Sequence, residues 1–182
     1  MIAGEFKGRR LKTPKWEGVR PTSDKLRETL FNVLAPRIAG AKVLDGYAGT
    51  GAVGIEALSR GAAHVTFVEQ DRRAAALIGA NLKKCGIANG YAIIQTTVLQ
   101  AIDRLRNTCT GSEAFDVILL DPPYATDTQD ALQHVGEIVK PDGVVVLEHA
   151  RKSESPVVPG RLVRTREVRS GDSALTFYSC QP

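Results

Sequence analysis

Val43-Leu44-Asp45-Gly46-Tyr47-Ala48-Gly49-Thr50-Gly51-Ala52-Val53-Gly54 is the stretch that decides the fold. It begins as a short apolar strand, passes through a glycine-rich turn and continues as a helix. Glycines in such a turn allow a ligand to approach the backbone closely. In open α/β folds a turn of this kind lies at the carboxyl edge of a parallel sheet, where ligands bind. The stretch therefore predicts a ligand-binding strand–turn–helix unit.

Strand and helix patterns alternate along the rest of the chain. The expected strands are 42–45, 64–68, 91–96, 115–120 and 143–148, and the expected helices are 24–34, 53–60, 72–85, 98–107 and 127–139. We expect Pro36 to end the first helix because proline lacks the backbone N–H. Short apolar strands that alternate with helices are typical of a parallel sheet covered on both faces. The fold class expected is therefore α/β.

The C-terminal region has a different pattern. Two strand-like runs, 162–169 and 174–180, flank the turn signal Ser170-Gly171-Asp172-Ser173. This arrangement predicts a β-hairpin that adds an antiparallel pair to the edge of the sheet. We expect residues 23–182 to form one domain, preceded by a short extension over residues 1–22.

The N-terminal extension is basic. Residues 1–27 hold eight Lys and Arg against three acids, within a chain whose formal net charge is +4. Glycines and the aromatic residues Phe6 and Trp16 lie between these charges, which favours a twisted β-hairpin. A basic arm on a nearly neutral body indicates a nucleic-acid binder, with a merely solvated N-terminus as the alternative. The residues expected to contact nucleic acid are Lys7, Arg9, Arg10, Lys12, Arg20, Thr22 and Arg27.

Several classes of protein are disfavoured by composition. No apolar run reaches the length of a membrane span, and the first residues do not resemble a signal peptide, so we expect a cytoplasmic protein without membrane contact. The three cysteines are scattered and odd in number, which argues against a disulfide framework. The histidines are isolated and show no metal-ligand spacing, so we expect no metal. The cysteines are Cys85, Cys109 and Cys180, and the histidines are His64, His134 and His149.

A second ligand signal is the tetrad Asp121-Pro122-Pro123-Tyr124, which directly follows the apolar run 115–120. Each proline fixes φ at about −65° and removes an N–H, so the loop is stiff and presents acceptors. The Asp121 carboxylate and the Pro122 carbonyl match the two donors of an exocyclic amine, and a base stacked on Tyr124 gains about 1–3 kcal/mol. All four residues are candidate catalytic residues, and a stiff turn is the structural alternative.

The glycine turn has two interpretations. Gly49-x-Gly51-x-x-Gly54 fits the dinucleotide fingerprint, which would indicate a nicotinamide-dependent oxidoreductase. However, Asp45 places a carboxylate four residues before the first of these glycines, and this suits a ligand with an amino group and a positive charge. S-adenosylmethionine is such a ligand. The expected cofactor residues are Asp45, Gly46, Tyr47, Gly49, Gly51, Glu69 for the ribose, Gln70 beside the adenine, and Thr97 and Val98 at the adenine edge.

Together the two signals predict methyl transfer to an amine. The methyl donor faces the amine held by Asp121 and Pro122, and transfer proceeds by in-line displacement. Most of the rate acceleration is expected from positioning, which supplies about 7–11 kcal/mol when reacting atoms are held close.

The chain also resembles a known family, the bacterial small-subunit ribosomal RNA guanine-N2 methyltransferases called RsmD, over nearly its whole length. The Arg20–Asn32 block is the most specific mark, because glycine turns and Asp-Pro-Pro-Tyr occur in many amino-methyltransferases. The motifs that carry the resemblance are Ile2-Ala3-Gly4, Gly8-Arg9-Arg10-Leu11, Arg20-Pro21-Thr22-Ser23-Asp24-Lys25-Leu26-Arg27-Glu28-Thr29-Leu30-Phe31-Asn32, Leu44-Asp45 to Gly51, Glu56-Ala57-Leu58-Ser59-Arg60-Gly61-Ala62 and Asp121 to Tyr124.

The resemblance implies a class I, Rossmann-like methyltransferase fold of seven strands, with S-adenosylmethionine as donor. It implies one guanine of 16S ribosomal RNA as target, within an assembling or assembled small subunit, and an Arg20–Asn32 block that closes over the cofactor and the substrate. Thr97-Val98 departs from the acid or amide followed by alanine that relatives often carry there.

Other functions stay open at this point. Adenine-N6 methylation uses the same amine acceptors, but the chain has no room for a domain that reads duplex DNA. RNA, in which an exposed loop base needs less extrusion, suits a short chain better. Methylation of a protein glutamine and RNA binding without catalysis are further alternatives. The basic arm disfavours methylation of a protein glutamine. The intact Asp121 tetrad disfavours RNA binding without catalysis.

Overall fold

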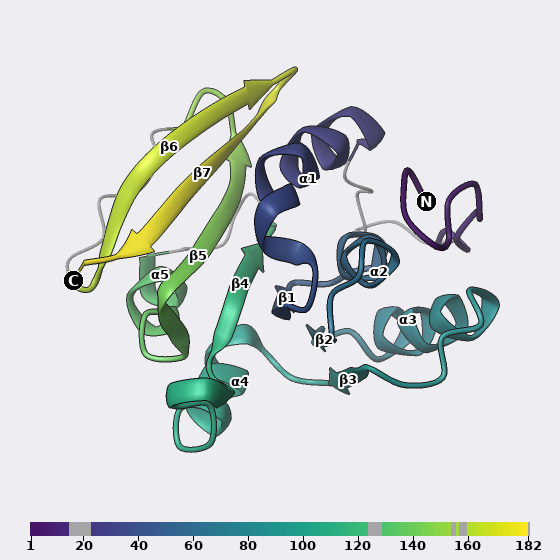
Figure 1. Cartoon of the computed structure of the whole chain (residues 1–182), viewed down its shortest axis with the longest axis horizontal. Coiled ribbons are helices and arrows are strands. Elements are labelled where there is room, and N and C mark those ends of the chain that lie inside the picture. The colour runs from purple at the N-terminus through teal and green to yellow at the C-terminus, as the bar shows by residue number, and fades with distance from the viewer. Residues whose placement is uncertain (15–22, 124–128, 154–155, 157–159, 182) are drawn as a thin grey trace.

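The computed structural model describes residues 1–14, 23–123, 129–153, 156 and 160–181. Seven strands form one sheet in the order β3-β2-β1-β4-β5-β7-β6 (Figure 1). Strands β1 to β5 pair in parallel, and β7 pairs antiparallel with both β5 and β6. The expected α/β class, with a mostly parallel sheet and an antiparallel C-terminal hairpin, is confirmed. The strands are β1 Lys42–Gly46, β2 His64–Val68, β3 Tyr91–Ile94, β4 Phe115–Leu120, β5 Val139–Ala150, β6 Leu162–Ser170 and β7 Ser173–Cys180.

Helices cover both faces of this sheet. One buried apolar cluster joins the sheet to the first three helices, and a second joins the opposite face to α4 and α5. The first cluster contains Phe31, Ile55 and Ile78, whereas the second contains Ile102 and Leu132. The helices are α1 Asp24–Ile38, α2 Ala52–Ser59, α3 Arg72–Lys84, α4 Val98–Leu105 and α5 Gln129–Val135, with a short 3₁₀ helix at Gly111–Glu113. Within the described ranges, no helix has both the length and the apolarity needed to span a membrane.

The order of the strands reverses between β1 and β4. The strands that follow β1 in sequence extend the sheet to one side as far as β3, and β4 begins the other side. Ligands in open α/β sheets bind outside the carboxyl ends of the strands at such a switch point. The fold therefore places its binding crevice where β1 and β4 end.

Of the element boundaries that differ from the sequence prediction, two have a clear physical reason. Helix α1 continues past Pro36 to Ile38, because the proline lies in the last turn and the buried Ile38 still packs into the core. Strand β5 begins at Val139, where the sequence predicts the end of a helix. Val139 pairs with Phe115, and the next residues of β5 bulge outward before the pairing resumes at Val144. Proline is tolerated at such a bulge, which explains Pro141 inside the strand.

The N-terminal extension also differs from the prediction. Residues 1–14 form turns and contain no strand, so the expected β-hairpin is wrong for this part, and residues 15–22 lie outside the described ranges. The reason is that the backbone donors of this segment bond either within its own turns or to the body of the protein. The N–H groups of Ile2 and Ala3 donate to the Glu56 carboxylate, each at 2.9 Å. Side chains of α2 therefore replace the partner strand that a hairpin would need.

Candidate active site

Three site residues leave the sheet at the same level. Gly46 pairs with Val68 on one side and with Leu120 on the other, and each of these residues ends its strand. The next residues, Tyr47, Glu69 and Asp121, are therefore neighbours at the carboxyl edge. Adjacent strands are about 4.8 Å apart, so the backbones of Glu69 and Asp121 are separated by about two strand spacings.

Asp45 lies beneath this level and is 4 % exposed. Its Oδ2 accepts a hydrogen bond from the N–H of Gly54 at 2.8 Å, which joins the end of β1 to the first turn of α2. The pKa of Asp45 is raised from 3.8 to about 7, mainly by burial; the Gly54 hydrogen bond acts to lower this pKa, and the charges of Asp121 and Glu69 also act to raise it. This cluster of carboxylates suits a cationic ligand, because a positive charge would stabilise the ionised form.

The glycine turn is shaped by close packing and by backbone strain. A Cβ at Gly54 would lie 2.3 Å from the Phe67 ring and 2.8 Å from Asp45 Oδ2, so only glycine permits this contact between α2 and the sheet. Tyr47 has φ of 61° and is the one non-glycine residue with positive φ in the described ranges. This conformation costs about 1–3 kcal/mol and is typical of functional sites.

Glu69 fixes the turn from the neighbouring strand. Its Oε2 accepts from the Gly49 N–H and its Oε1 accepts from the Asp71 N–H, both at 2.8 Å. An ionised carboxylate has about four acceptor sites, so both oxygens keep capacity for the hydroxyls of a ribose. Glu69, which is predicted to bind the ribose, thus also links the glycine turn to the start of α3.

The predicted adenine side lies at the ends of β2 and β3. Gln70 is exposed next to Glu69, and Thr97 is exposed at the N-cap of α4, where its hydroxyl accepts from the Gln100 N–H at 3.3 Å. Val98 is buried in the first turn of α4 and packs 3.6 Å from the position of a Cβ on Gly46. The structure therefore gives Thr97 a capping role, and a contact between Thr97 and adenine stays a prediction.

The predicted amine-binding loop begins at the end of β4. Asp121 and Pro122 are half-buried and Pro123 is exposed, while Tyr124 lies outside the described residues. The charge of Asp121 acts on Asp45, which places the predicted amine acceptor beside the predicted cofactor carboxylate. The structure thus brings the two ligand signals of the sequence together.

The predicted nucleic-acid residues fall into two groups, and Arg20 and Thr22 lie outside the described ranges. Lys7, Arg10 and Lys12 are exposed on the N-terminal segment. In contrast, the Arg27 side chain is only 9 % exposed and pairs with Asp24 at 2.7 Å. Its Nε is buried without a hydrogen-bond partner among the described residues. Contact between these side chains and RNA stays a prediction.

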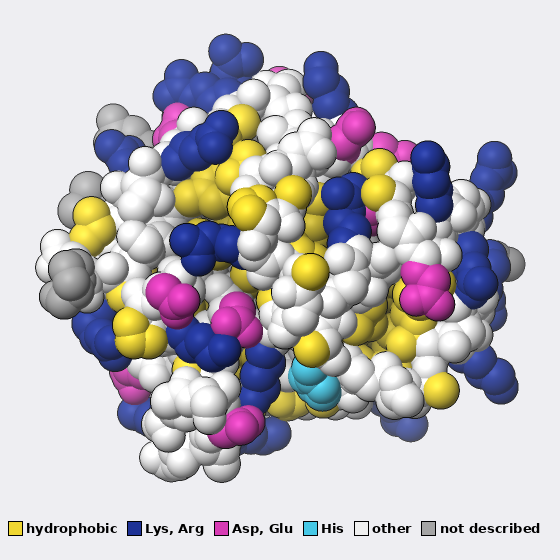
Figure 2. Space-filling model, viewed as in Figure 1, with side chains coloured by type: hydrophobic (Ala, Val, Ile, Leu, Met, Phe, Trp, Pro, Cys, Tyr) yellow, Lys and Arg dark blue, Asp and Glu magenta, His cyan; other side chains and the backbone are white. Residues whose placement is uncertain are grey.

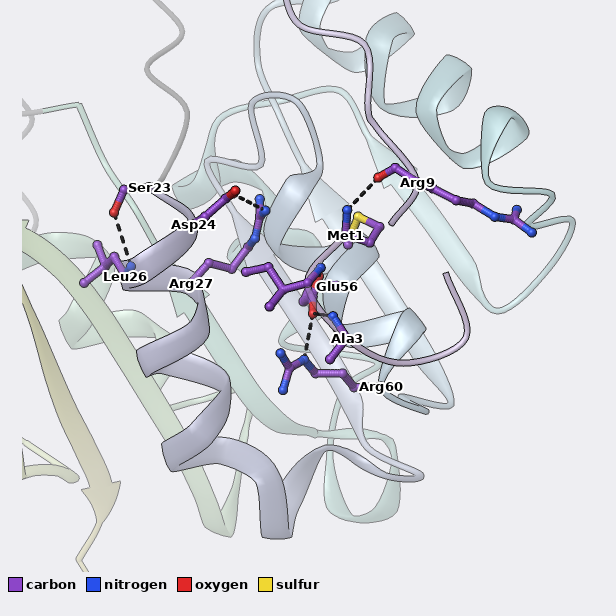
Figure 3. Close-up of polar contacts among 10 residues, drawn as sticks. Met1, Ala3, Arg9, Ser23, Asp24, Leu26, Arg27, Glu56 and Arg60 are labelled. Atoms are coloured by element: carbon purple, nitrogen blue, oxygen red, sulfur yellow. Dashed lines mark hydrogen bonds and ion pairs between the residues drawn. The ribbon is translucent and has the colours of Figure 1, made fainter. Parts of the chain in front are cut away.

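Two buried polar residues with a structural role, Glu56 and Asn81, were not predicted from the sequence. Glu56 is fully buried, and besides the two N-terminal amides it accepts from Arg60 Nε at 2.8 Å (Figure 3). Asn81 is also fully buried, and it joins Lys12 to the glycine turn through the Thr50 carbonyl. A polar residue on an apolar helical stripe was the available signal, since Asn81 lies between Ile78 and Leu82 in sequence.

Comparisons with known proteins find relatives over nearly the whole chain. A family model described as "Conserved hypothetical protein 95" matches residues 1–179. A Bacillus subtilis strain 168 protein, provisionally named rRNA methyltransferase YlbH, is 36% identical over 181 residues, which are 98% of this chain and 97% of that protein. Ribosomal RNA small subunit methyltransferase D of Escherichia coli K12 is 34% identical over 182 residues, which are 98% of this chain and 88% of that protein.

The solved structures give the same result. The structure of an Escherichia coli protein, provisionally named methyltransferase yhhF, superposes with a TM-score of 0.83 and 31% identity. The match covers 100% of this chain and 98% of that one. The seven-stranded class I fold is thus confirmed by a full-length likeness. The family model, the relatives and the motifs of the sequence all agree, and the chain belongs to the RsmD family.

Proposed function

We propose that this protein transfers a methyl group from S-adenosylmethionine to the exocyclic N2 amine of one guanine in 16S ribosomal RNA. The observation that carries the proposal is the meeting of Asp45, Glu69 and Asp121 at one edge of the sheet, where the pKa of Asp45 is raised to about 7. The relatives named as small-subunit ribosomal RNA methyltransferases support RNA as the substrate class.

The residues of the glycine turn fit this donor. When bound, S-adenosylmethionine supplies an electrophilic methyl group on a positively charged sulfur. Asp45 offers a buried negative charge to its cationic part, and Glu69 offers acceptors to its ribose. Gln70 and the Thr97-Val98 loop lie on the side assigned to the adenine. Gly46, Tyr47, Gly49 and Gly51 shape the turn between them.

The amine is held by acceptors on the opposite side of the switch point. The Asp121 carboxylate and the Pro122 carbonyl each accept one N–H of the guanine amine. These bonds draw the nitrogen lone pair out of conjugation with the ring, so the nitrogen becomes a better nucleophile. Asp121 then receives the proton that the amine loses and passes it to water. Pro123 stiffens the loop, and Tyr124 is assigned the stacking role.

The proposal also covers the setting of the reaction. We assign the substrate to an assembling or assembled small ribosomal subunit in the cytoplasm. In-line displacement at a methyl group requires positioning rather than a Lewis acid, so the proposed reaction uses no metal ion.

The test uses small subunits from cells that lack the enzyme. The wild-type protein is expected to transfer one labelled methyl group, and mapping is expected to place it on N2 of a guanine. Asp121→Ala is expected to lower the rate by at least about 10²-fold, since a small misplacement of reacting groups costs that much. The same variant is expected to bind S-adenosylhomocysteine with little change.

Several results would contradict the proposal. Mapping of the label to N6 of an adenine would favour the alternative target. Normal turnover by Asp121→Ala would remove the amine clamp from the mechanism. Thermal stabilisation of the protein by NAD, without stabilisation by S-adenosylhomocysteine, would indicate an oxidoreductase and refute the cofactor assignment.

A further inference from the structure

The N-terminal segment, residues 1–14, is docked on helix α3. The Lys12 N–H donates to Asn81 Oδ1 at 2.7 Å, and Asn81 Nδ2 donates back to the Lys12 carbonyl at 3.2 Å. Arg9 Nη1 donates to the Cys85 carbonyl, just past the end of the same helix. The segment and the last turns of α3 therefore form one continuous surface (Figure 1).

This surface is strongly basic. The segment and the last turn of α3 together carry six Lys and Arg side chains but only one acid, Glu5. Basic side chains line the right edge of the molecule in Figure 2, where the segment and α3 lie in Figure 1. Helix α3 contributes no acid over its thirteen residues, so its own side chains provide no counter-charge. Such a surface matches the phosphate backbone of a nucleic acid.

The helical spacing separates the two lysines at the end of α3. Lys84 is three residues after Asn81, and residues three apart are neighbours on a helix surface. Lys83 is two residues after Asn81, and residues two apart do not face each other. Both lysines are exposed and both lie in the last turn. Lys84 therefore borders the docked segment, whereas Lys83 lies on another side of the helix.

We infer that Lys84 joins Lys7, Arg10 and Lys12 in a second RNA-binding surface, which holds phosphates of the folded RNA away from the methylated base. The inference rests on the proposed RNA substrate. Helix α3 starts just after Glu69 and has thirteen residues, so its far end lies about 20 Å from the start of the helix; α3 links β2 to β3, whereas Asp121 ends β4 on the other side of β1. Only an RNA with structure well beyond the target loop reaches both places.

The docking contacts hold this surface in place. Glu56 and Ser59 of α2 bind the first six residues, and Ser59 Oγ accepts from the Phe6 N–H at 2.9 Å. A Cβ at Gly4 would lie 1.7 Å from the Ser59 carbonyl oxygen, so this close approach requires glycine. Because the backbone is fixed, the basic side chains are presented to RNA with less loss of entropy than those of a free arm.

The test compares Lys84→Gln with Lys83→Gln, which removes the same charge from the same helical turn. Binding of full-length 16S ribosomal RNA is measured over a series of salt concentrations. Loss of one phosphate contact is expected to raise the Kd about fivefold near physiological salt and to lower the salt slope by about one. Lys83→Gln is expected to match the wild type, and Lys84→Arg is expected to restore binding.

The second part of the test measures binding of a short RNA stem-loop that contains the target guanine but none of the surrounding RNA structure. Lys84→Gln is expected to bind it like the wild type, because the stem-loop does not reach the end of α3. Equal effects of Lys83→Gln and Lys84→Gln would overturn the inference, as would an equal loss on the stem-loop. If methyl transfer maps to another base while Lys84→Gln alone weakens binding, the proposed function fails and this surface stands.

Discussion

Replacement of Asp45 by Asn should stabilise the ligand-free protein while it weakens the binding of the cofactor. Burial raises the pKa of the Asp45 carboxyl from 3.8 to about 7, so in the folded protein the group keeps its proton up to neutral pH. The unfolded chain loses that proton above about pH 4. Between about pH 4 and 7, unfolding therefore releases a proton, and the stability of the wild-type protein falls as the pH rises.

The size of the effect follows from the same pKa. A rise of about three pH units, at about 1.36 kcal/mol per unit, corresponds to about 4 kcal/mol of stability lost at pH 8. Asparagine stays neutral and still accepts from the Gly54 N–H, and the raised pKa of Asp45 already includes the bond from Gly54 to the ionised carboxylate. The expected net gain at pH 8 is therefore about 4 kcal/mol, or roughly 8–16 °C in Tm for a domain of this size.

Thermal unfolding of the wild type and of Asp45→Asn at pH 4 to 8 measures the difference. The two curves should nearly coincide at pH 4 and separate as the pH rises. Asp116→Asn is a control, because this substitution is expected to change the stability in the opposite direction. Burial acts to raise the Asp116 pKa, but the hydrogen bonds from Lys140 and Lys42 outweigh it and lower the pKa. That variant should lose stability at neutral pH. A difference between Asp45→Asn and the wild type that does not change with pH would refute the reasoning.

Three further substitutions test other parts of the structure. Glu56→Gln leaves an amide facing backbone donors and removes the partner of Arg60, so urea unfolding should show a loss of about 3 kcal/mol, with faster hydrogen exchange in residues 1–6. Gly54→Ala drives a methyl group into the Phe67 ring, and we expect a loss of about 1–3 kcal/mol together with weaker binding of S-adenosylhomocysteine in calorimetry. Arg10→Gln should leave the Tm unchanged but flatten the salt dependence of RNA binding, and an unchanged slope would make this residue a solvated charge.

Most of the fold was predictable because its signals are local. Strand β2 and strand β4 have the predicted bounds, since each is a short apolar run between helices. The start of β5 was not predictable, because Pro141 and its charged neighbours look like a loop. The strand forms there because Lys140 pairs with Asp116 on β4 at 2.6 Å, a contact that joins residues far apart in sequence.

The candidate site also has some features that were predictable from the sequence and others that were not. A parallel sheet brings the residues after its strands to one edge, so the meeting of Glu69 and Asp121 followed from the strand assignments alone. The docking of the N-terminal segment did not follow, because the donors of Ile2 and Ala3 find their acceptor 54 and 53 residues away. Alternating charge and glycine predicted a hairpin there, but side chains of α2 satisfied the backbone instead.

The N-terminal segment is attached mainly through its own main chain. The bonds to Glu56, Ser59 and Asn81 use backbone atoms of the segment, so they persist whatever side chains the segment carries at positions 7, 10 and 12. Mutations at these positions are therefore expected to change the charge that the segment presents without loss of the main-chain contacts that hold it. The side chains at these three positions can thus be exchanged independently of the buried acceptors, which makes the segment a fixed main-chain scaffold with variable side chains.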